Sequence, residues 1–480
     1  MFGEINSTVK KVKVGYVGMI QLNFRGDKES VFNKSQEELA KLSAKYDFEL
    51  YIYPKLIVTK DDAYEAKRAV EENGVDLLLL QNTSFCSGYL VQILSRVDVY
   101  IGLWAVPETT AGGPMPLNSF CGINLGAAII QNYLKAYDIK YKWFYGYGEY
   151  FEERLTYTLP ALRAYKNLKG RNVALVGGVA PGFDNFYDDE RLIEKKFGVR
   201  VSRHDEFEDV AERARGYDSA DPHLQEIRNQ IGGFDCCVTA SPEESLEKHA
   251  RLTKAYLDLA ADNKYDAIAP SCWPKSRLKM GIVFCATFGL LNDMGLVTVC
   301  EGDVLSAVSM LALKYISDFT PTIMDLSNVD FDDESAYLWH CGIGSKYYAK
   351  PNTLRLEDHF NPGPFNPETG WATKSPVCAM QFDDMHVSIM RFTHECEKMF
   401  LMDGDIFSKA GHDGSGGWMK NMRLNGETIN VKDLINTIMA RGYHHHYPLV
   451  KGDYFGTLVE LSYLLDLQLI ERENYTPWRV

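Results

Sequence analysis

Acidic residues in the second half of the chain occur where a metal site could form. Glu301 and Asp303 follow an apolar run and precede an amphipathic helix pattern, and Asp325 interrupts another apolar run. Acids often simply cap helices, but the carboxyl end of a parallel strand is also where open α/β sheets place ligands. A carboxylate in apolar surroundings must be paired, protonated or metal-bound, because its isolated burial is costly. These positions therefore indicate a carboxylate-rich site.

Histidines occur in two further stretches. His340 ends an expected strand beside Trp339, and His444, His445 and His446 follow one another near the end of the sequence. Neighbouring side chains of a strand point to opposite faces, so at most two of these three can face one site. Two carboxylates with one or two imidazoles suit Mn²⁺ or a related divalent ion. The spacings match no short-range metal motif, and a single histidine such as His340 is equally compatible with a hydrogen-bonded core position.

The elements expected to position these residues divide the chain into three domains. Residues 1–165 and 166–318 alternate apolar strand patterns with helix patterns, which predicts two doubly wound, Rossmann-like α/β domains with parallel sheets. Residues 319–480 contain short alternating runs between Gly, Pro and Asn turns, which predicts a β-rich domain resembling a barrel or sandwich. This division assigns Glu301 to the second domain and Asp325, His340 and His446 to the third.

Individual strands and a glycine-rich turn can also be predicted. In the first domain, strands are expected at 12–19, 48–54, 75–81 and 97–107, and in the second at 171–176, 233–240, within 265–274 and within 295–303. Gly177, Gly178 and Gly182 follow one of these strands, but their spacing is not GxGxxG. We therefore expect a tight turn there and no nucleotide cofactor.

Composition restricts the classes of partner. With 51 basic and 65 acidic residues the net charge is −14, which argues against a general binder of nucleic acids or anionic membranes. No run approaches the roughly 20 apolar residues that span a bilayer. The ten cysteines show no CxxC spacing, which favours free thiols in a reducing compartment. We expect a cytoplasmic protein that acts on a small molecule.

Five short motifs contain or adjoin the acidic and histidine stretches. They are "CWP" at 272–274, "CEGD" at 300–303, "PTIMDL" at 321–326, "WHCG" at 339–342 and "HHYPLVKGD" at 445–453. In combination they resemble the L-fucose isomerase and L-arabinose isomerase superfamily, and the fucose isomerase-like branch in particular. The N-terminal half shares only the α/β alternation and the segment "PLNSFCGINL" at 116–125.

The resemblance implies an aldose–ketose sugar isomerase, a homo-oligomer (trimer or hexamer) whose active site lies between domains and between subunits. It further implies a divalent metal, usually Mn²⁺ but also Co²⁺ or Mg²⁺, held by Glu301, Asp325 and His446. On this alignment His445 should point away from the metal, whereas an offset of one residue would make His445 the ligand. His340 resembles an additional histidine of the arabinose branch, expected to bind the metal or a substrate hydroxyl.

The chemistry implied by this site needs two carboxylates. Converting an aldose to a ketose moves a proton between C1 and C2 while O1 and O2 exchange roles. A metal that binds both oxygens stabilises the negative charge of a cis-enediolate. One carboxylate takes the C2 proton while another group handles the oxygen-bound proton. We assign Glu301 and Asp325 to this pair, in either order.

The substrate is less well indicated by the sequence. Trp104, Trp273, Trp339 and Trp418 could stack on a sugar, and Trp273 belongs to a motif, although a tryptophan often only packs. Lys275, Arg277 and Lys279 follow "CWP" and form either a solvated turn or an anion pocket. In the second case Arg277, supported by Lys275, would bind the anionic group of a sugar such as sulfoquinovose. We expect His445 also to contact the substrate.

Two alternatives to the isomerase remain open at this point. A non-catalytic sugar-binding protein could have the same two-domain α/β architecture, but it would not need two carboxylates beside a metal. An epimerase or lyase could form the same enediolate and release a different product. The products of the reaction distinguish these three functions.

Overall fold

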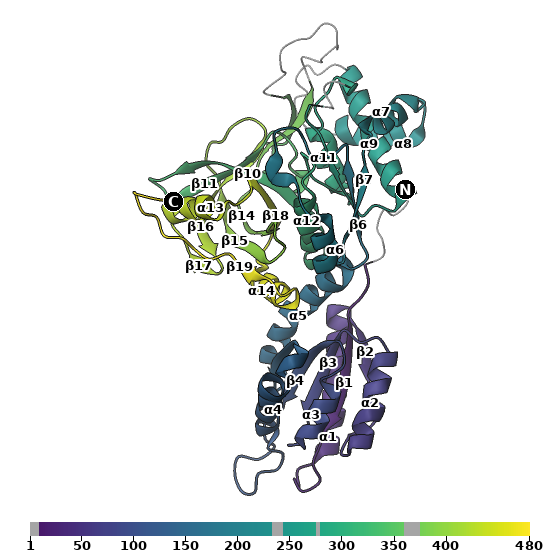
Figure 1. Ribbon diagram of the computed structural model, residues 1–480, viewed down its shortest axis with the longest axis vertical. Coiled ribbons are helices and arrows are strands. Elements are labelled where there is room, and N and C mark those ends of the chain that lie inside the picture. The colour runs from purple at the N-terminus through teal and green to yellow at the C-terminus, as the bar shows by residue number, and fades with distance from the viewer. Residues whose placement is uncertain (1–8, 233–242, 275–278, 360–374) are drawn as a thin grey trace. The chain divides into compact units, whose positions relative to one another are not determined.

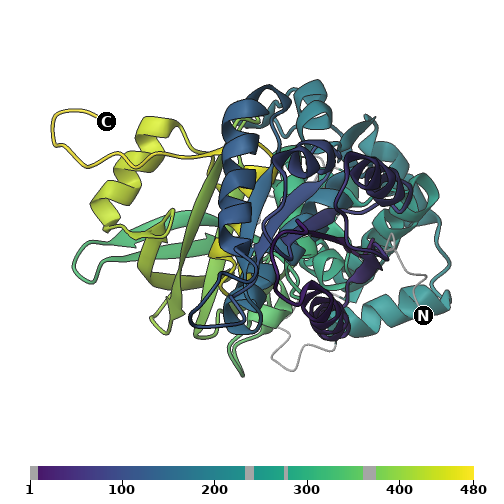
Figure 2. The same ribbon diagram turned by 90° about the horizontal axis from the view of Figure 1, so that it is seen from below.

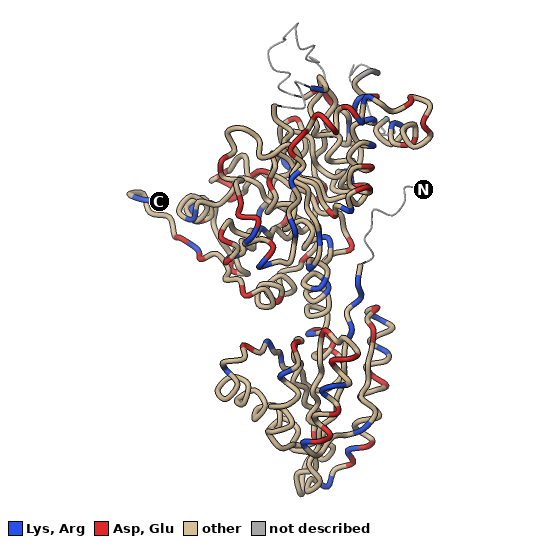
Figure 3. Tube along the Cα trace, turned by 45° about the vertical axis from the view of Figure 1, so that its right-hand side comes forward, with Lys and Arg blue, Asp and Glu red and all other residues tan. Residues whose placement is uncertain are grey.

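The computed structural model describes residues 9–232, 243–274, 279–359 and 375–480, and the chain folds as two compact units (Figure 1). The N-terminal unit spans Lys10–Lys166, and the C-terminal unit contains Asn167–Val480. Acidic and basic residues are interspersed along both units (Figure 3). Within the described ranges, no helix is long and apolar enough to cross a membrane.

The N-terminal unit is a parallel sheet with helices on both faces (Figure 2). Its strand order is β2-β1-β3-β4-β5. The strands are β1 (Lys13–Met19), β2 (Glu49–Ile52), β3 (Leu77–Asn82), β4 (Tyr100–Ala105) and β5 (Tyr141–Tyr145). The helices are α1 (Lys28–Tyr46), α2 (Lys60–Glu72), α3 (Gly88–Leu94), α4 (Ser119–Ala128) and α5 (Glu149–Leu168), with short η1 (Ile129–Tyr133) and η2 (Lys135–Tyr137). Because β3 and β4 are covered on both faces, all their residues are buried, as in doubly wound folds.

The C-terminal unit begins with a second parallel sheet, of order β7-β6-β8-β9. Its strands are β6 (Asn172–Val176), β7 (Arg200–His204), β8 (Ala267–Pro270) and β9 (Val297–Thr298). Its helices are α6 (Glu190–Phe197), α7 (Phe207–Gly216), α8 (Pro222–Gly232), α9 (Glu243–Asn263), α11 (Cys285–Asp293) and α12 (Val304–Ile316), with η3 (Asp184–Phe186). The strand expected at 233–240 lies outside the described residues.

The rest of the unit is a β-barrel with attached strands. The elements are β10 (Thr322–Asp330), β11 (Ser335–His340), η4 (Lys346–Tyr348), β12 (Arg355–Asp358), β13 (Pro376–Gln381), β14 (Met385–Phe392), β15 (Lys398–Phe407), β16 (Ser415–Leu424), β17 (Glu427–Thr428), α13 (Val431–Arg441), β18 (His446–Lys451), α14 (Phe455–Leu464) and β19 (Gln468–Leu469). Antiparallel pairings run from β10 through β11, β16, β15, β14 and β18 back to β10, and so close a ring of six strands.

Helix α12 connects the second parallel sheet to the barrel. All its residues except Lys314 are buried, and it contacts β6, β8 and β9 of the sheet as well as β14 and β18 of the barrel. A helix that is apolar on every side must be covered on every side, so the sheet and the barrel share one core around α12. Residues that begin this helix therefore face both structures.

The predicted fold class is confirmed, because two parallel α/β sheets precede a β-rich region. The chain ends with the order α13, β18, α14 and β19. The proposed domain boundary at 165/166 falls inside α5, and that at 318/319 falls between α12 and β10. As domain limits, these boundaries stay predictions.

Candidate active site

Glu301 is held in a tight turn between β9 and α12. It adopts a left-handed backbone conformation (φ 63°), and Gly302 follows with φ 77°. A Cβ atom on Gly302 would lie only 2.7 Å from the carbonyl oxygen of Gly178, so a side chain is excluded there. The carbonyl of Glu301 accepts a hydrogen bond from the N–H of Ala180 (3.0 Å). A non-glycine residue with positive φ is uncommon and persists where surrounding contacts enforce it.

Asp303 has two roles, only one of which is helix capping. Its Oδ1 accepts the N–H of Ser306 (3.0 Å) at the start of α12. The guanidinium of Arg391 binds both its carboxylate oxygens (2.6 and 3.0 Å), and Nδ1 of His446 lies 2.8 Å from Oδ2. Burial alone would raise the pKa of Asp303, but Arg391 and His446 outweigh it and hold this pKa well below its usual value. Asp303 is therefore an anion that holds His446 in place.

The Asp303 contact decides which nitrogen of His446 is available. With Nδ1–H donating to Asp303, Nε2 carries the lone pair. Nε2 lies 3.4 Å from Oε2 of Glu301 and 3.8 Å from Oδ1 of Asp325. Carboxylate support of this kind typically orients histidines that bind metals.

Asp325 comes to this site through the barrel register. On β10 it pairs with His446 of β18 on one side and with Trp339 of β11 on the other. Its Oδ1 atom is buried, and no hydrogen-bond partner is found for it among the described residues. A buried carboxylate oxygen that has no hydrogen-bond donor and lies near an imidazole nitrogen is suited to contact a cation. Glu301, His445 and His446 each offer one ligand atom, and these three atoms lie within 4.8 Å of one another, so this set fits a divalent metal. Asp325, whose Oδ1 lies 3.8 Å from Nε2 of His446, stays a predicted ligand.

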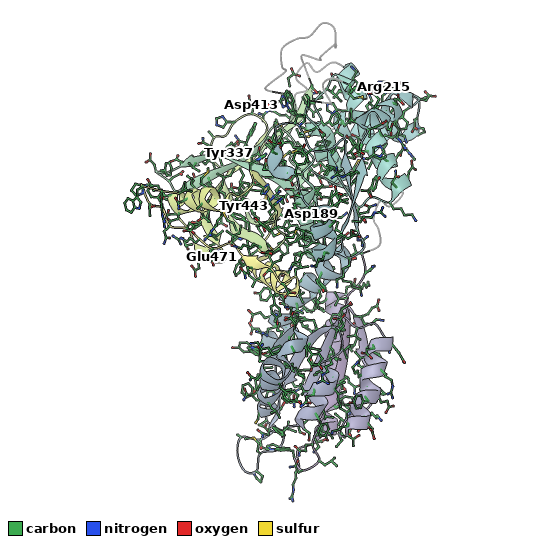
Figure 4. The ribbon with its side chains drawn as sticks, in the orientation of Figure 1. Asp189, Arg215, Tyr337, Asp413, Tyr443 and Glu471 are labelled. Atoms are coloured by element: carbon green, nitrogen blue, oxygen red, sulfur yellow. The ribbon has the colours of Figure 1, made fainter. Side chains whose placement is uncertain are left out.

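The three consecutive histidines have three different environments. The Phe186 ring stacks on His444 and His446, with ring centroids 5.8 and 4.8 Å apart, and Tyr443, labelled in Figure 4, precedes the run. His445 lies 41% exposed, with Nε2 3.1 Å from Oε2 of Glu301. The expectation that His445 points away from the site is wrong. Strand alternation does not apply to it, because β18 begins only at His446.

His340 and Cys300 form the buried side of the site. Nε2 of His340 lies 3.2 Å from Sγ of Cys300, which is 3.5 Å from Nε2 of His446. Nδ1 of His340 accepts the backbone N–H of Cys341 (2.9 Å). Burial, with Glu301 nearby, raises the pKa of Cys300 well above its usual value, so its thiol is neutral. His340 thus lies beside the three candidate ligands.

A pocket of about 240 Å³ opens beside Glu301. Its wall combines apolar, aromatic, thiol and imidazole groups from the sheet and the barrel, which suits a small ligand. The lining residues are Phe183, Cys272, Trp273, Val283, Phe284, Cys285, Phe288, Cys300, Glu301, His340, Cys341, Ile343 and His359. The sequence-predicted residues Glu301, His340 and Trp273 therefore share one cavity.

Other predicted substrate residues lie elsewhere or outside the described residues. Lys275 and Arg277 fall in 275–278, which the structure does not describe. Lys279 is half exposed and forms an ion pair with Glu208 (2.7 Å). The remaining tryptophans of interest, Trp104, Trp339 and Trp418, donate their indole N–H to the backbone carbonyls of Gly146, Asp413 and Ala410.

Two residues of the site were not predicted from the sequence. Arg391 stands in the apolar run "HVSIMRFT", so a buried charge could have been suspected there by the argument used for Asp325. Phe186 carried no such signal, because its contact with the histidines depends on the turn after β6 approaching β18. Both residues support His446 and do not line the pocket.

Comparisons with known proteins point to sugar isomerases. No protein-family model matches the chain. A curated protein of Priestia aryabhattai named sulfoquinovose isomerase is 25% identical over 427 residues, which cover 87% of this chain and 90% of the relative. A protein of the same name from Alkalicoccus urumqiensis is 24% identical over 433 residues, which cover 88% and 91% of the two chains. A third, from Clostridium sp. (strain MSTE9), is 28% identical over 58% of this chain and 62% of the relative.

Solved structures add no argument. A periplasmic solute-binding protein from Actinobacillus succinogenes 130z with bound D-allose is 12% identical and covers 64% of this chain and 92% of its own, but the TM-score is 0.17. The relatives named above, in contrast, confirm the expectation that the chain is an enzyme of the isomerase class. They do not confirm membership of the L-fucose isomerase superfamily.

Proposed function

We propose that this protein is a metal-dependent aldose–ketose isomerase whose substrate is a sulfonated hexose such as sulfoquinovose. The observation that carries the proposal is the convergence of Glu301, Asp325 and Nε2 of His446 beside a pocket of sugar size. The names of the relatives support the sulfonated substrate.

The two carboxylates are suited to the proton transfers of the reaction. Glu301 comes from the end of the parallel sheet and Asp325 from the barrel, and a carboxylate oxygen of each lies within 4 Å of Nε2 of His446, which supports their assignment as the acid–base pair. In the aldose-to-ketose direction one carboxylate removes the C2 proton and the proton is delivered to C1, while the hydroxyl proton passes from O2 to O1. An enediolate connects the two halves of the reaction. No atoms are gained or lost overall.

Residues around the carboxylates complete the site. Glu301, Asp325 and His446 would hold a divalent cation, with Mn²⁺ the first candidate and Co²⁺ or Mg²⁺ as alternatives. When bound, this cation would stabilise the negative charge that develops on the substrate oxygens. His445 is a cation candidate on the exposed side, because Glu301 and Asp325 together outweigh the effect of burial and raise its pKa. His340 lines the pocket wall, where it can donate to a sugar hydroxyl.

The anionic part of the substrate requires a cationic partner. Among the pocket-lining residues that the structure describes, histidine is the only side chain able to carry a positive charge. Lys275 and Arg277 follow the pocket-lining Trp273 by two and four positions in the sequence. We propose that Arg277 binds the sulfonate by two parallel hydrogen bonds, with Lys275 in support.

The first experiment is to incubate the EDTA-treated protein with sulfoquinovose, L-fucose, D-arabinose and L-arabinose, with and without Mn²⁺, and to follow ketose formation by NMR. We expect a ketose from sulfoquinovose that requires the metal. A C2-epimeric aldose would instead indicate an epimerase, cleavage products a lyase, and unchanged sugar with metal bound a sugar-binding protein.

A pair of variants tests the anion hypothesis. Arg277→Ala should raise KM for the sulfonated sugar by about 10- to 100-fold, the range expected for a lost charge-assisted bidentate contact. Lys279→Ala is the matched control, since Lys279 pairs with Glu208. Equal effects of Arg277→Ala on anionic and neutral sugars would contradict sulfonate recognition by this residue.

The quaternary structure and location stay predictions. The resemblance described above implies a trimer or hexamer with residues of a second subunit at the active site. Multi-angle light scattering of the purified protein tests this, and a monomer with full activity would overturn it. A cytoplasmic location is likewise a prediction, which fractionation of the source cells tests.

A further inference from the structure

A second group of potential metal ligands lies in the wall of the same pocket. Cys285, Cys341 and His359 each offer one ligand atom, and these three atoms lie within 4.8 Å of one another. The two sulfurs are 3.2 Å apart. All three residues are half-buried and line the pocket, so an ion has a route to them from solvent.

The ligand types in this group differ from those of the proposed isomerase site. Thiolate and imidazole select borderline and soft ions, whereas carboxylates select harder ions such as Mn²⁺. A set of three protein ligands with two sulfurs and one nitrogen is also typical of zinc sites that keep one position open. We infer that Cys285, Cys341 and His359 form a second, sulfur-containing cation site for Zn²⁺ or a chemically similar ion.

The fold supports these three ligands from three separate elements. Cys285 is the first residue of α11, where the helix dipole favours negative charge on its sulfur. Cys341 follows β11, and His359 follows β12, which pairs with β13. Ligands that come from a helix and two strand ends of one folded unit are pre-positioned, so the site does not require one flexible loop to wrap around the ion.

His340 separates this site from the isomerase site. Its Nδ1 lies 3.3 Å from Sγ of Cys341, and its Nε2 lies 3.2 Å from Sγ of Cys300. An ion at the second site would therefore occupy the wall of the cavity that also contains Glu301. The pocket thus contains two ligand sets of different chemistry, with one imidazole between them.

A competing sulfur-containing set must be distinguished from this one. Cys300, His340 and His446 also lie close enough to share an ion. However, His446 is oriented by Asp303 so that Nε2 faces the carboxylates, and Cys300 is buried, with 4% of its surface exposed. The half-buried Cys285 set is the better candidate for an ion that exchanges with solvent.

The consequence for the enzyme follows from the shared cavity. If the chain is the proposed isomerase, Zn²⁺ at the second site should compete with the sugar and inhibit the Mn²⁺-loaded enzyme. This consequence rests on the proposed function, but the ion-binding site itself does not. The two claims can therefore be tested separately.

Cobalt is the probe for the site, since Co²⁺ bound by thiolates gives intense visible bands and a sulfur-to-cobalt charge-transfer band. We titrate the reduced, EDTA-treated full-length protein with CoCl₂ and then with ZnCl₂. The expected result is a thiolate–cobalt spectrum that Zn²⁺ abolishes. Cys285→Ser and Cys341→Ser should each remove the charge-transfer band, and His359→Ala should weaken cobalt binding by about tenfold or more.

Two control variants show which set of ligands gives the cobalt spectrum. Cys300→Ser removes the sulfur of the competing set, and Glu301→Gln alters the carboxylate set, so both should keep the charge-transfer band. A band that is lost in Cys300→Ser but kept in Cys285→Ser, or no thiolate–cobalt band in the native protein, would overturn the inference. Circular dichroism of each variant confirms that it is folded. Failure of isomerase activity with an intact cobalt spectrum would reject the proposed function while leaving the second site established.

Discussion

The two parallel sheets have the same strand order around their first strands, yet their carboxyl ends are chemically different. In the N-terminal sheet, Gln81 at the end of β3 accepts hydrogen bonds from Tyr16 (2.7 Å) and Thr83 (2.9 Å) and donates one to Ser35 (2.8 Å). In the C-terminal sheet, the chain leaving β9 presents Glu301 to His446, which also lies near Asp325, and the buried Oδ1 of Asp325 lacks a hydrogen bond among the described residues.

The difference shows that the doubly wound fold supplies a location and that the side chains supply the chemistry. The amide of Gln81 and the hydroxyls around it satisfy one another, which stabilises a core. Carboxylates and imidazoles at the second sheet are incompletely satisfied, which leaves them able to bind an ion or a substrate. A shared fold therefore does not imply a shared role.

The strongest test of this comparison is Glu301→Gln. The substitution keeps the size of the side chain but removes its charge and basicity, so we expect kcat/KM of the isomerase to fall by about 1,000-fold or more. The melting temperature should change little, because Glu301 lies at the pocket wall. An active variant would contradict the assignment of chemistry to this end of the sheet.

A second large effect is expected at Asp303, whose carboxylate contacts Nδ1 of His446. Asp303→Asn leaves the fully buried Arg391 without its anionic partner, so the free energy of unfolding should fall by about 3–5 kcal/mol. Urea denaturation measures this loss. Arg391→Lys is the milder companion variant, because it retains the charge but not the two-point geometry, and it should be destabilised by less.

A pH-dependent effect on the free energy of unfolding is expected at Asp293, the last residue of α11, which packs beside the second parallel sheet. Burial, opposed by hydrogen bonds from Ser345 and the Lys346 backbone, raises the pKa of Asp293 to about 6 from 3.8. A carboxyl whose pKa is higher in the folded state stabilises the fold below about pH 4 and loses that contribution as the pH rises through 6.

Asp293→Asn removes this titration. Relative to the native protein, the variant should therefore gain up to about 3 kcal/mol of unfolding free energy between pH 4 and pH 7, as measured by urea denaturation at each pH. A difference between the two proteins that does not change with pH would contradict the raised pKa. Activity should be affected far less than by Glu301→Gln, because Asp293 does not line the pocket.

The smallest effect is expected in the N-terminal sheet. Tyr16→Phe removes one hydrogen bond to Gln81, which keeps its bond from Thr83, so the cost should be about 1 kcal/mol. Thermal unfolding measures the cost, and kcat/KM measured alongside should stay within about twofold. A loss of activity comparable to that of Glu301→Gln would show that the hydrogen-bonded end of this sheet takes part in the reaction.

Much of the architecture could be predicted because it depends on local patterns. The apolar runs of β3 and β8 and the turn at Gly177 and Gly178, both of which have positive φ, are encoded within a few residues. Asp325 could be selected because a carboxylate within an apolar strand must have a partner. The identity of that partner could be proposed only from the family resemblance.

Contacts between distant segments could not be predicted in the same way. The environment of His445 does not follow from strand periodicity, because β18 begins only at His446. The approach of Phe186 to the three histidines and the clustering of Cys285, Cys341 and His359 depend on how the sheet packs against the barrel. Nothing in the spacing of these residues along the chain indicates that they meet.

The closed ring of barrel strands has a consequence for anyone who wishes to redesign this protein. Each strand of the ring has two neighbours, so an insertion in β10 or β18 would displace Asp325 or His446 from its register with both. Trp273, in contrast, lies in the connection that follows β8, and connections between elements generally tolerate changes in length and sequence. Libraries aimed at new sugar specificities should therefore diversify the segment after β8 and leave the ring unchanged.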